Sequence, residues 1–370
     1  MAGWRRGVVS ELLEKRSDLV VAIVEADGQN LKAVAFPSMV PALRAGDEVV
    51  LNTTGIDLEL GTGGEAFVLW NLSNPELPQR GKGHIVKLRY TPWQTEVLVA
   101  EAPESPHHAG LKEVTSIDGV PVVVCGVHSH LGPVAAGIKG VNPDARVGYL
   151  MTDGAALPLA WSNLVGELKT AGLLDVTCTS GHAFGGDLEA VNNFSGMTAL
   201  RSAGEVDAIV VAMGPGVVGT DTSLGFTAME QGPLLDASGA LGGRPIACLR
   251  ISFVDDRERH YGISHHCLTT LTIGTQTRCT VAVPELLDDQ ARIVALQLEK
   301  SGVAQRHELV EADGTGAIRR AIDEGIQLRS MGRAVEDNPE YFLAAGAAGA
   351  LAGRSTLGSP GDKPPEGAPE

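Results

Sequence analysis

The chain has 370 residues, of which 44% are hydrophobic and only 4% aromatic, and its formal net charge is −16 at pH 7. This length accommodates two domains, with a core built from aliphatic side chains. The acidic balance argues against nucleic acid as a partner, which normally needs a basic face. The sequence contains no run of about 18 apolar residues, so it predicts no membrane span. Charged residues interrupt the N-terminal segment, so we expect no signal peptide and a cytoplasmic location.

Short apolar runs separated by turn residues predict that residues 1–100 are all-β. The expected strands are residues 20–24, 32–36, 48–51 and 66–70, followed by 85–89 and 96–100. Closely spaced short strands are typical of a small barrel or sandwich.

Apolar runs alternate with helix-length segments over residues 101–352. The expected strands are 121–126, 145–151, 176–179, 208–213, 245–251, 280–283 and 306–310. The expected helices are 133–140, 157–171, 187–203, 227–239, 285–300 and 315–325. This alternation predicts a doubly wound, mostly parallel α/β domain of the Rossmann-like kind. The tail, residues 353–370, is rich in Gly, Pro and charge, and we expect it to be disordered.

The cysteines lie mostly in apolar, strand-like contexts and show no C-x-x-C spacing. They are Cys125, Cys178, Cys248, Cys267 and Cys279. Buried, reduced thiols are favoured over a redox role.

Polar or glycine-rich segments follow five of the expected strands. They are residues 126–130, 152–154, 180–189, 214–222 and 252–266. Ligands of open parallel sheets bind beyond the carboxyl ends of the strands, so we predict a ligand site there.

The segment Gly214–Thr222 carries three glycines, Gly214, Gly216 and Gly219, which allow close backbone approach to an anion. Thr220 and Thr222 add hydroxyl donors. The segment lacks the lysine of a P-loop. Binding of a phosphate or carboxylate is one interpretation, and a flexible turn is the other.

Histidines supply candidate acid–base groups or metal ligands. His128 and His130 are two residues apart, so an extended segment would place them on the same side. Further ligands for a divalent metal would come from later strand ends, namely His182, Asp187, His265 and His266. The alternative is that these histidines are hydrogen-bonded pocket or loop residues.

Charged residues at the same strand ends have two interpretations each. Asp153, Asp187 and Glu189 suit general acid–base chemistry or hard-metal binding, although a turn former, a helix N-cap and a first-turn acid are the ordinary explanations. Arg257 and Arg259 suit an anion clamp, with a solvated charged loop as the alternative.

Several motifs together resemble a family. They are Gly83–Pro92, Glu104–His108, Met151–Gly154, Ala183–Ala190, Gly214–Thr222 and Gly262–His266. They are similar to those of an uncharacterised bacterial family of unknown function, known mainly from actinobacteria and firmicutes. The resemblance extends from Trp4 to about Pro284. It bears on fold and location and assigns no role to any residue.

The leading hypothesis is an enzyme, a hydrolase or group transferase, that acts on a small anionic metabolite held by the glycine-rich loop. In it the histidines act as acid–base groups or ligands, and Asp153 and Asp187 orient them or share a metal. One alternative is a non-catalytic ligand sensor or regulator whose β-domain mediates assembly. Another is a structural protein in which the glycine-rich loops pack together. We expect a homo-oligomer and no membrane partner.

Overall fold

The computed structural model describes residues 3–59, 64–76 and 83–357 and divides the chain into two units, Met1–Val97 and Leu98–Glu370. The sequence placed this boundary at residue 100. The expected tail, residues 353–370, falls largely outside the described residues. The final helix nevertheless continues to Thr356, so residues 353–356 are helical and not disordered.

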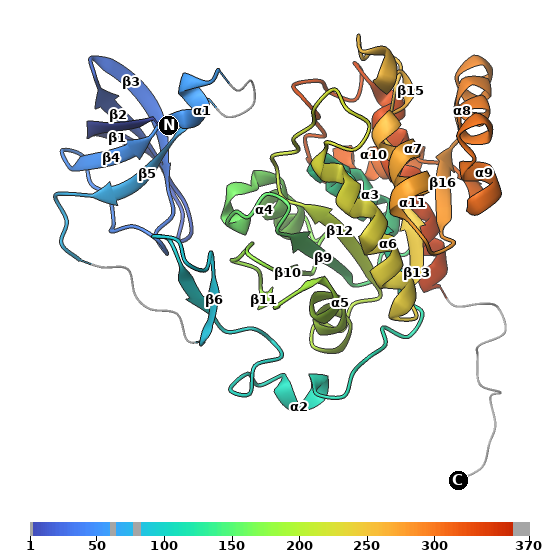
Figure 1. The fold of residues 1–370 in the computed structure, drawn as a ribbon, viewed down its shortest axis with the longest axis horizontal. Coiled ribbons are helices and arrows are strands. Elements are labelled where there is room, and N and C mark those ends of the chain that lie inside the picture. Colours follow the sequence, from blue (N-terminus) through green and yellow to red (C-terminus); the bar gives the residue numbers. More distant parts are fainter. Residues whose placement is uncertain (1–2, 60–63, 77–82, 358–370) are drawn as a thin grey trace. The chain divides into compact units, whose positions relative to one another are not determined.

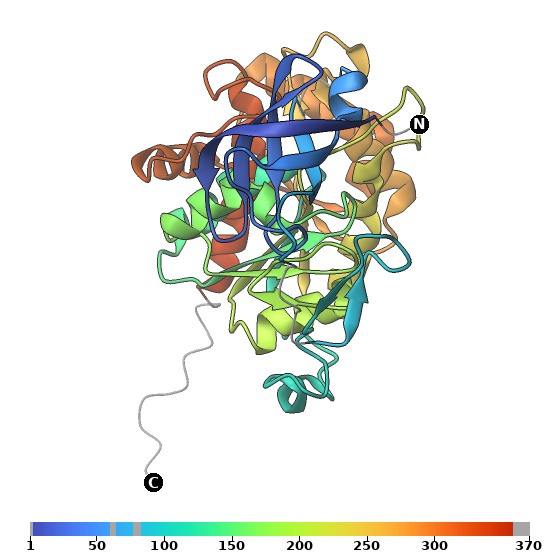
Figure 2. The ribbon, with the colours of Figure 1, turned by 90° about the vertical axis from the view of Figure 1, so that its left-hand side faces the viewer.

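The first unit contains a closed five-stranded barrel in the order β1-β2-β3-β5-β4. The strands are β1 (Trp4–Lys15), β2 (Val20–Ala26), β3 (Gln29–Ala35), β4 (Glu48–Asn52) and β5 (Ala66–Asn71). Figure 2 shows these strands in shades of blue. Aliphatic side chains such as Val9, Val24 and Leu51 fill the interior. The unit also holds a short helix and a two-stranded antiparallel ribbon, namely α1 (Thr54–Asp57), β6 (Ile85–Lys87) and β7 (Thr95–Val97).

The second unit is built on an eight-stranded sheet in the order β11-β10-β9-β12-β8-β13-β16-β17, and all of its pairings are parallel. The strands are β8 (Pro121–Val124), β9 (Val147–Thr152), β10 (Val176–Thr179), β11 (Leu188–Glu189), β12 (Ala208–Met213), β13 (Arg244–Ala247), β16 (Thr280–Pro284) and β17 (Glu308–Ala312). The central strands are buried throughout, as their continuous Val, Ile and Ala runs indicate.

Helices cover both faces of this sheet (Figure 1). The helices of this unit are α2 (His108–Leu111), α3 (Leu131–Val141), α4 (Asn163–Thr170), α5 (Asn193–Ser202), α6 (Gln231–Ala240), α7 (His265–Thr269), α8 (Asp288–Ser301), α9 (Val303–Arg306), α10 (Thr315–Asp323) and α11 (Pro339–Thr356). One core contains residues of α3, α4 and α11, and the opposite core contains residues of α5, α6 and α8. The predicted fold class, a barrel-like domain followed by a doubly wound α/β domain, is therefore confirmed. Among the described helices, none has the length and apolar character to cross a membrane.

Helix α11 has no counterpart among the predicted elements, although it is buried along most of its length. It packs against α3 at a distance that only glycine allows. A Cβ atom added to Gly349 would lie 2.2 Å from the carbonyl oxygen of Val134. A Cβ atom on Gly137 of α3 would lie 2.7 Å from the carbonyl oxygen of Gly346.

Two local predictions were wrong, and both concern candidate site residues. The helix expected over residues 187–203 begins at Asn193, where Asn192 forms a capping box, so Asp187 and Glu189 are not its cap and first turn. They lie instead around the short strand β11. His128 and His130 lie in a 3-10 turn, η1 (His128–His130), and not in an extended segment with both rings on one side.

Candidate metal and anion site

Two of the predicted strand-end segments meet beyond the sheet. Strand β12 lies between β9 and β8, and the chain then crosses β8 to reach β13. The ring of Phe226, which follows the glycine-rich loop, stacks on His266 with ring centroids 4.0 Å apart. From the same loop Asp221 forms a 2.5 Å ion pair with Arg259. The loop after β12 is thereby joined to the segment after β13.

Three histidines form a cluster at this junction, and we call it the histidine cluster: His260, His265 and His266. His260 ends a 3-10 turn, η4 (Glu258–His260), and the other two begin α7. A hairpin of β14 (Ile251–Ser252) and β15 (Gly262–Ile263) folds the segment back. One ring nitrogen of each histidine lies within 4.8 Å of the others, a spacing suited to one metal ion.

Ser264 fixes the orientation of two of these rings. Its hydroxyl shares a 2.7 Å hydrogen bond with Nδ1 of His260 and accepts a 3.3 Å hydrogen bond from the amide of His266. Within the described part of the chain, Nε2 of His265 and Nδ1 of His266 are buried and have no hydrogen-bond partner. Buried polar atoms rarely remain unpartnered, so these two nitrogens point to a missing ligand.

Burial keeps the cluster uncharged. Burial and then the neighbouring His265 lower the pKa of His266 to about 3. Burial and then Arg250 lower the pKa of His260 to about 4. The pKa of His265 is also lowered, by burial and by Arg259. Neutral imidazole is the form that ligates metal ions, and these rings are in it at pH 7.

The arginines beside the cluster differ in how they are engaged. Arg257 binds Asp255 through two nitrogens at 2.9 and 2.8 Å, and Arg250 adds a contact at 3.2 Å. The Arg257 guanidinium therefore holds the pKa of Asp255 well below its usual range. Arg259 pairs with Asp221, but its Nε is buried without a hydrogen-bond partner in the described residues. Arg259 thus retains a donor for an anion.

The glycine-rich loop closes on itself as a hairpin. The hydroxyls of Thr220 and Thr222 lie 2.9 Å apart, and Thr220 also donates to the carbonyl of Gly225 at 2.9 Å. The amide of Gly225 donates to Thr222 at 3.0 Å. The threonine hydroxyls therefore stabilise the turn in this structure, and their predicted role in anion binding stays a prediction.

Two glycines of the loop have geometric roles. Gly216 has a φ of +125°, a backbone conformation that glycine adopts readily. A Cβ atom on Gly219 would lie 3.3 Å from Cε1 of His266, so its absence lets the loop backbone lie against that ring. Gly214 lies against Leu157 and Met151 at the end of β9, away from this contact.

The remaining predicted histidines lie in other surroundings. His128 is buried, with Nδ1 3.2 Å from the hydroxyl of Tyr149 and Nε2 2.7 Å from that of Ser162. Burial lowers its pKa to about 4. Since both of its nitrogens are engaged, we do not include it in the site. The amide of His182 donates to Asp153 at 3.1 Å, which joins the ends of β9 and β10.

Asp187 is bound within its own edge of the sheet. Its carboxylate accepts hydrogen bonds from Lys169 at 2.6 and 2.7 Å and from the amide and hydroxyl of Thr177 at 2.9 and 2.8 Å. Burial raises its pKa, but the hydrogen bonds from Lys169 and Thr177 outweigh burial and lower it. The structure therefore does not group Asp187 with the histidine cluster.

Glu230 is a titratable residue that the sequence analysis did not select. Its carboxylate accepts a 2.8 Å hydrogen bond from Thr152 and lies beside Asp153. Burial raises the pKa of Glu230 to about 7, the range of a general acid or base. Glu230 ends η3 (Thr227–Glu230), inside a segment predicted as helix, and nothing in its spacing from Asp153 predicts their meeting. His260 lies within residues 252–266, which were predicted to follow a strand, but it was not selected, because its approach to His265 depends on the hairpin.

A separate cavity of about 250 Å³ opens near the end of β8. It is lined by Ser129, Leu164, Glu167, Gln327, Leu328 and Arg329. None of these residues belongs to the histidine cluster. The unpartnered imidazole nitrogens of the histidine cluster are a more specific indication of a bound ligand than the size of this cavity.

Comparison with known proteins supplies a family and no activity. A family model described as a protein of unknown function (DUF3866) matches residues 32–349. No curated protein matches the chain. Among solved structures, YjeQ from Thermotoga maritima is 9% identical, with 62% of this chain and 65% of that chain covered and a TM-score of 0.13. The match spans less than two thirds of the YjeQ chain, and a similarity this low indicates neither a shared fold nor a shared function.

Proposed function

Since the chain belongs to the DUF3866 family of proteins of unknown function, we propose from its own geometry that it is a metal-dependent hydrolase or group transferase. In this proposal His260, His265 and His266 hold a divalent ion, and Arg259 binds an anionic group of the substrate beside it.

The observation that carries the proposal is the pair of buried, unpartnered nitrogens on His265 and His266. A metal ion would satisfy both at once. Three protein ligands plus an open position is the pattern of catalytic zinc sites. The hydrogen bond between Nδ1 of His260 and the hydroxyl of Ser264 matches the outer contacts that orient metal-binding imidazoles.

The chemistry would be addition of water to an ester or amide of a small anion. A bound divalent ion would supply a more acidic water molecule and polarise the scissile group. The water oxygen forms the new bond to phosphorus or carbon, the ester or amide bond breaks, and the leaving group takes a proton from solvent. Arg259 would hold a phosphate or carboxylate oxygen through its free Nε–H.

The test is elemental analysis of tagless protein purified without chelator, for wild type, His265→Ala, His266→Ala and the control His107→Ala. His107 precedes α2, outside the cluster. We expect wild type and control to hold about one equivalent more of a divalent transition metal than either cluster variant does. Equal metal content in all four proteins would contradict the metal site.

Turnover separates the enzyme from the alternative. The metal-loaded protein is assayed with p-nitrophenyl phosphate and other small phosphoesters, and the two cluster variants are expected to lose activity. A protein that holds the metal and binds phosphate but turns over none of these substrates would instead support a ligand-binding or regulatory protein.

We also propose a cytoplasmic location and a homo-oligomer. The first is supported by the five cysteines, which are all free and buried, as in proteins of reducing compartments. The second is supported by apolar side chains exposed on β1, with Trp4 63% and Val8 46% exposed. Light scattering of the purified protein measures the oligomeric state.

A further inference from the structure

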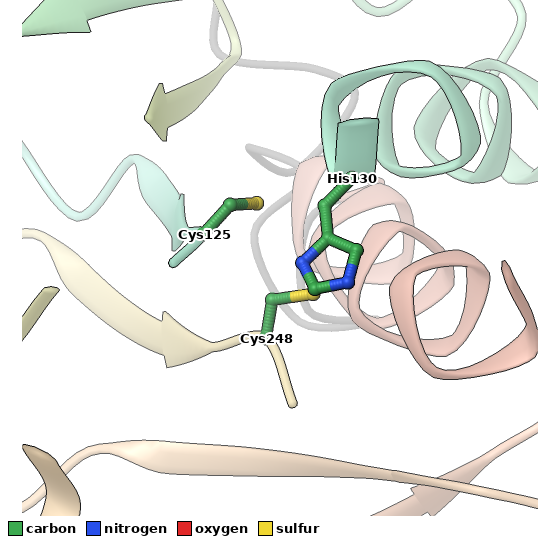
Figure 3. Close-up of side chains that lie close together, drawn as sticks. All are labelled: Cys125, His130 and Cys248. Carbon is green, nitrogen blue, oxygen red and sulfur yellow. The ribbon is translucent and has the colours of Figure 1, made fainter. Parts of the chain in front are cut away.

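A second group of potential metal ligands lies inside the α/β unit, beyond the ends of β8 and β13. It consists of Cys125, His130 and Cys248, which we call the thiol cluster (Figure 3). Strands β8 and β13 are paired in register, with Val124 opposite Ala247, so the next residues along each strand are the two cysteines. Figure 3 shows both cysteine side chains pointing toward the His130 ring. One sulfur or nitrogen atom from each residue lies within 4.8 Å of the others.

The thiol cluster is buried, and one of its polar atoms is unsatisfied. Exposure is 1% for Cys125 and 0% for His130 and Cys248. Nδ1 of His130 lies 3.4 Å from the sulfur of Cys248, while its Nε2 is buried without a hydrogen-bond partner in the described residues. The ring rests on Tyr341, with centroids 4.5 Å apart. Packing and a sulfur contact therefore position this imidazole, but they do not satisfy it.

The chain contains a second buried Cys–His pair that serves as an internal comparison. The sulfur of Cys279 also lies 3.4 Å from Nδ1 of His307. In that pair the amide of Cys279 donates to Nδ1 at 3.3 Å, and Nε2 pairs with the carbonyl of Leu271 at 2.7 Å. Both nitrogens of His307 are satisfied by one cysteine and the backbone, as a structural pair requires. The thiol cluster differs from this pair in two ways: it has a second cysteine sulfur, and Nε2 of its histidine has no partner in the described residues.

We propose that Cys125, His130 and Cys248 form a second metal site, selective for a thiophilic d10 ion, Zn²⁺ or Cu⁺. Thiolate and imidazole are soft or borderline ligands that favour these ions over Mg²⁺ or Ca²⁺. Two thiolates neutralise the charge of Zn²⁺, which makes a buried complex tolerable where an unpaired ion would not be. Binding forms two metal–sulfur bonds and releases two thiol protons to solvent, with no change of oxidation state.

A metal at this position would join three parts of the fold: the ends of two neighbouring sheet strands and the turn that leads into α3. The site is closed to solvent, so the ion would enter during folding or local opening. This inference does not depend on the histidine cluster, because the two clusters share no residue.

The test uses full-length protein produced and purified without oxygen from medium containing Co²⁺, which substitutes for Zn²⁺. Thiolate-to-cobalt charge transfer absorbs in the near ultraviolet, and a histidine-only site does not produce that band. We expect the band in wild type, its loss in Cys125→Ser and Cys248→Ser, and its retention in the control Cys279→Ser and in His266→Ala. Retention in His266→Ala separates this site from the proposed catalytic one.

Metal content provides the second readout. After anaerobic loading with Zn²⁺ or with Cu⁺, the two thiol-cluster variants are expected to hold one equivalent less than Cys279→Ser. If the serine variants fail to fold, the charge-transfer band and the metal content of wild type and Cys279→Ser alone test the proposal. Folded wild type that shows no charge-transfer band and retains no Cu⁺, or serine variants with unchanged metal content, would overturn the proposal.

Discussion

Single residues near the sheet ends show how burial sets protonation. Glu230 has a pKa of about 7 in the folded chain, against 4.5 for the free side chain. The folded state therefore binds more protons than the unfolded state between these values. Its contribution to stability is fully present below about pH 4.5 and is lost as the pH rises through about 7.

Glu230→Gln should remove this loss, because the amide stays neutral and its oxygen still accepts from Thr152. Relative to wild type, we expect the variant's free energy of unfolding to rise between pH 5 and pH 8 by about 1 to 2 kcal/mol. Urea unfolding at the two pH values measures this difference. A difference between variant and wild type that does not change with pH would contradict the assignment.

Arg259 is the residue whose replacement separates anion binding from metal binding. Removing a charge-assisted hydrogen bond usually costs about 1.5 to 3 kcal/mol, so Arg259→Gln should weaken phosphate binding about 10- to 100-fold. The metal content should stay unchanged. Calorimetric titration with phosphate, alongside elemental analysis, checks both statements.

Asp221→Asn is the matched control for Arg259→Gln, since it removes the negative charge that pairs with Arg259 and keeps the shape of the Asp221 side chain. We expect phosphate binding in this variant to equal or exceed that of wild type. If Arg259→Gln binds phosphate as tightly as wild type does, the guanidinium has no part in the site.

At the scale of elements, a strand or helix could be predicted when its apolar residues formed a distinct pattern and its side chains were buried. Strands β8 and β12 were found within a few residues, because buried Val and Ile runs bounded by turns are distinctive. Strand β1 was missed because most of its side chains are exposed. Helix α11 was missed because its Ala- and Gly-rich sequence has low helix propensity at each glycine, and only packing on α3 selects the helix.

The close contact between α11 and α3 makes a testable contrast between two glycines. Gly349→Ala should destabilise the protein by about 1 to 3 kcal/mol, because the added methyl group meets the backbone of Val134. Gly316→Ala, in α10, meets nothing within 4 Å and should stabilise by about 0.4 to 1 kcal/mol. Urea unfolding of both variants checks the signs, and equal effects would contradict the packing described.

At the scale of the whole molecule, the order of strands determined which residues could form a site. The sequence predicted that His265 and His266 follow a strand. It did not predict that β12 lies beside β8, which brings Phe226 to His266. His260 and Glu230 could not be selected for the same reason, since each acquires its neighbours through the fold. His128 was selected by its spacing from His130 and Asp187 by its place after a strand, yet each is held by partners that no local pattern predicts.

We propose above all that the histidine cluster binds a catalytic metal ion. Anomalous diffraction at the zinc absorption edge, from crystals of chelator-free protein supplied with Zn²⁺, tests it most directly. We expect a strong anomalous peak about 2.0 to 2.1 Å from one nitrogen each of His260, His265 and His266. Zinc-supplied crystals that show ordered rings for these three histidines and no peak between them would contradict it.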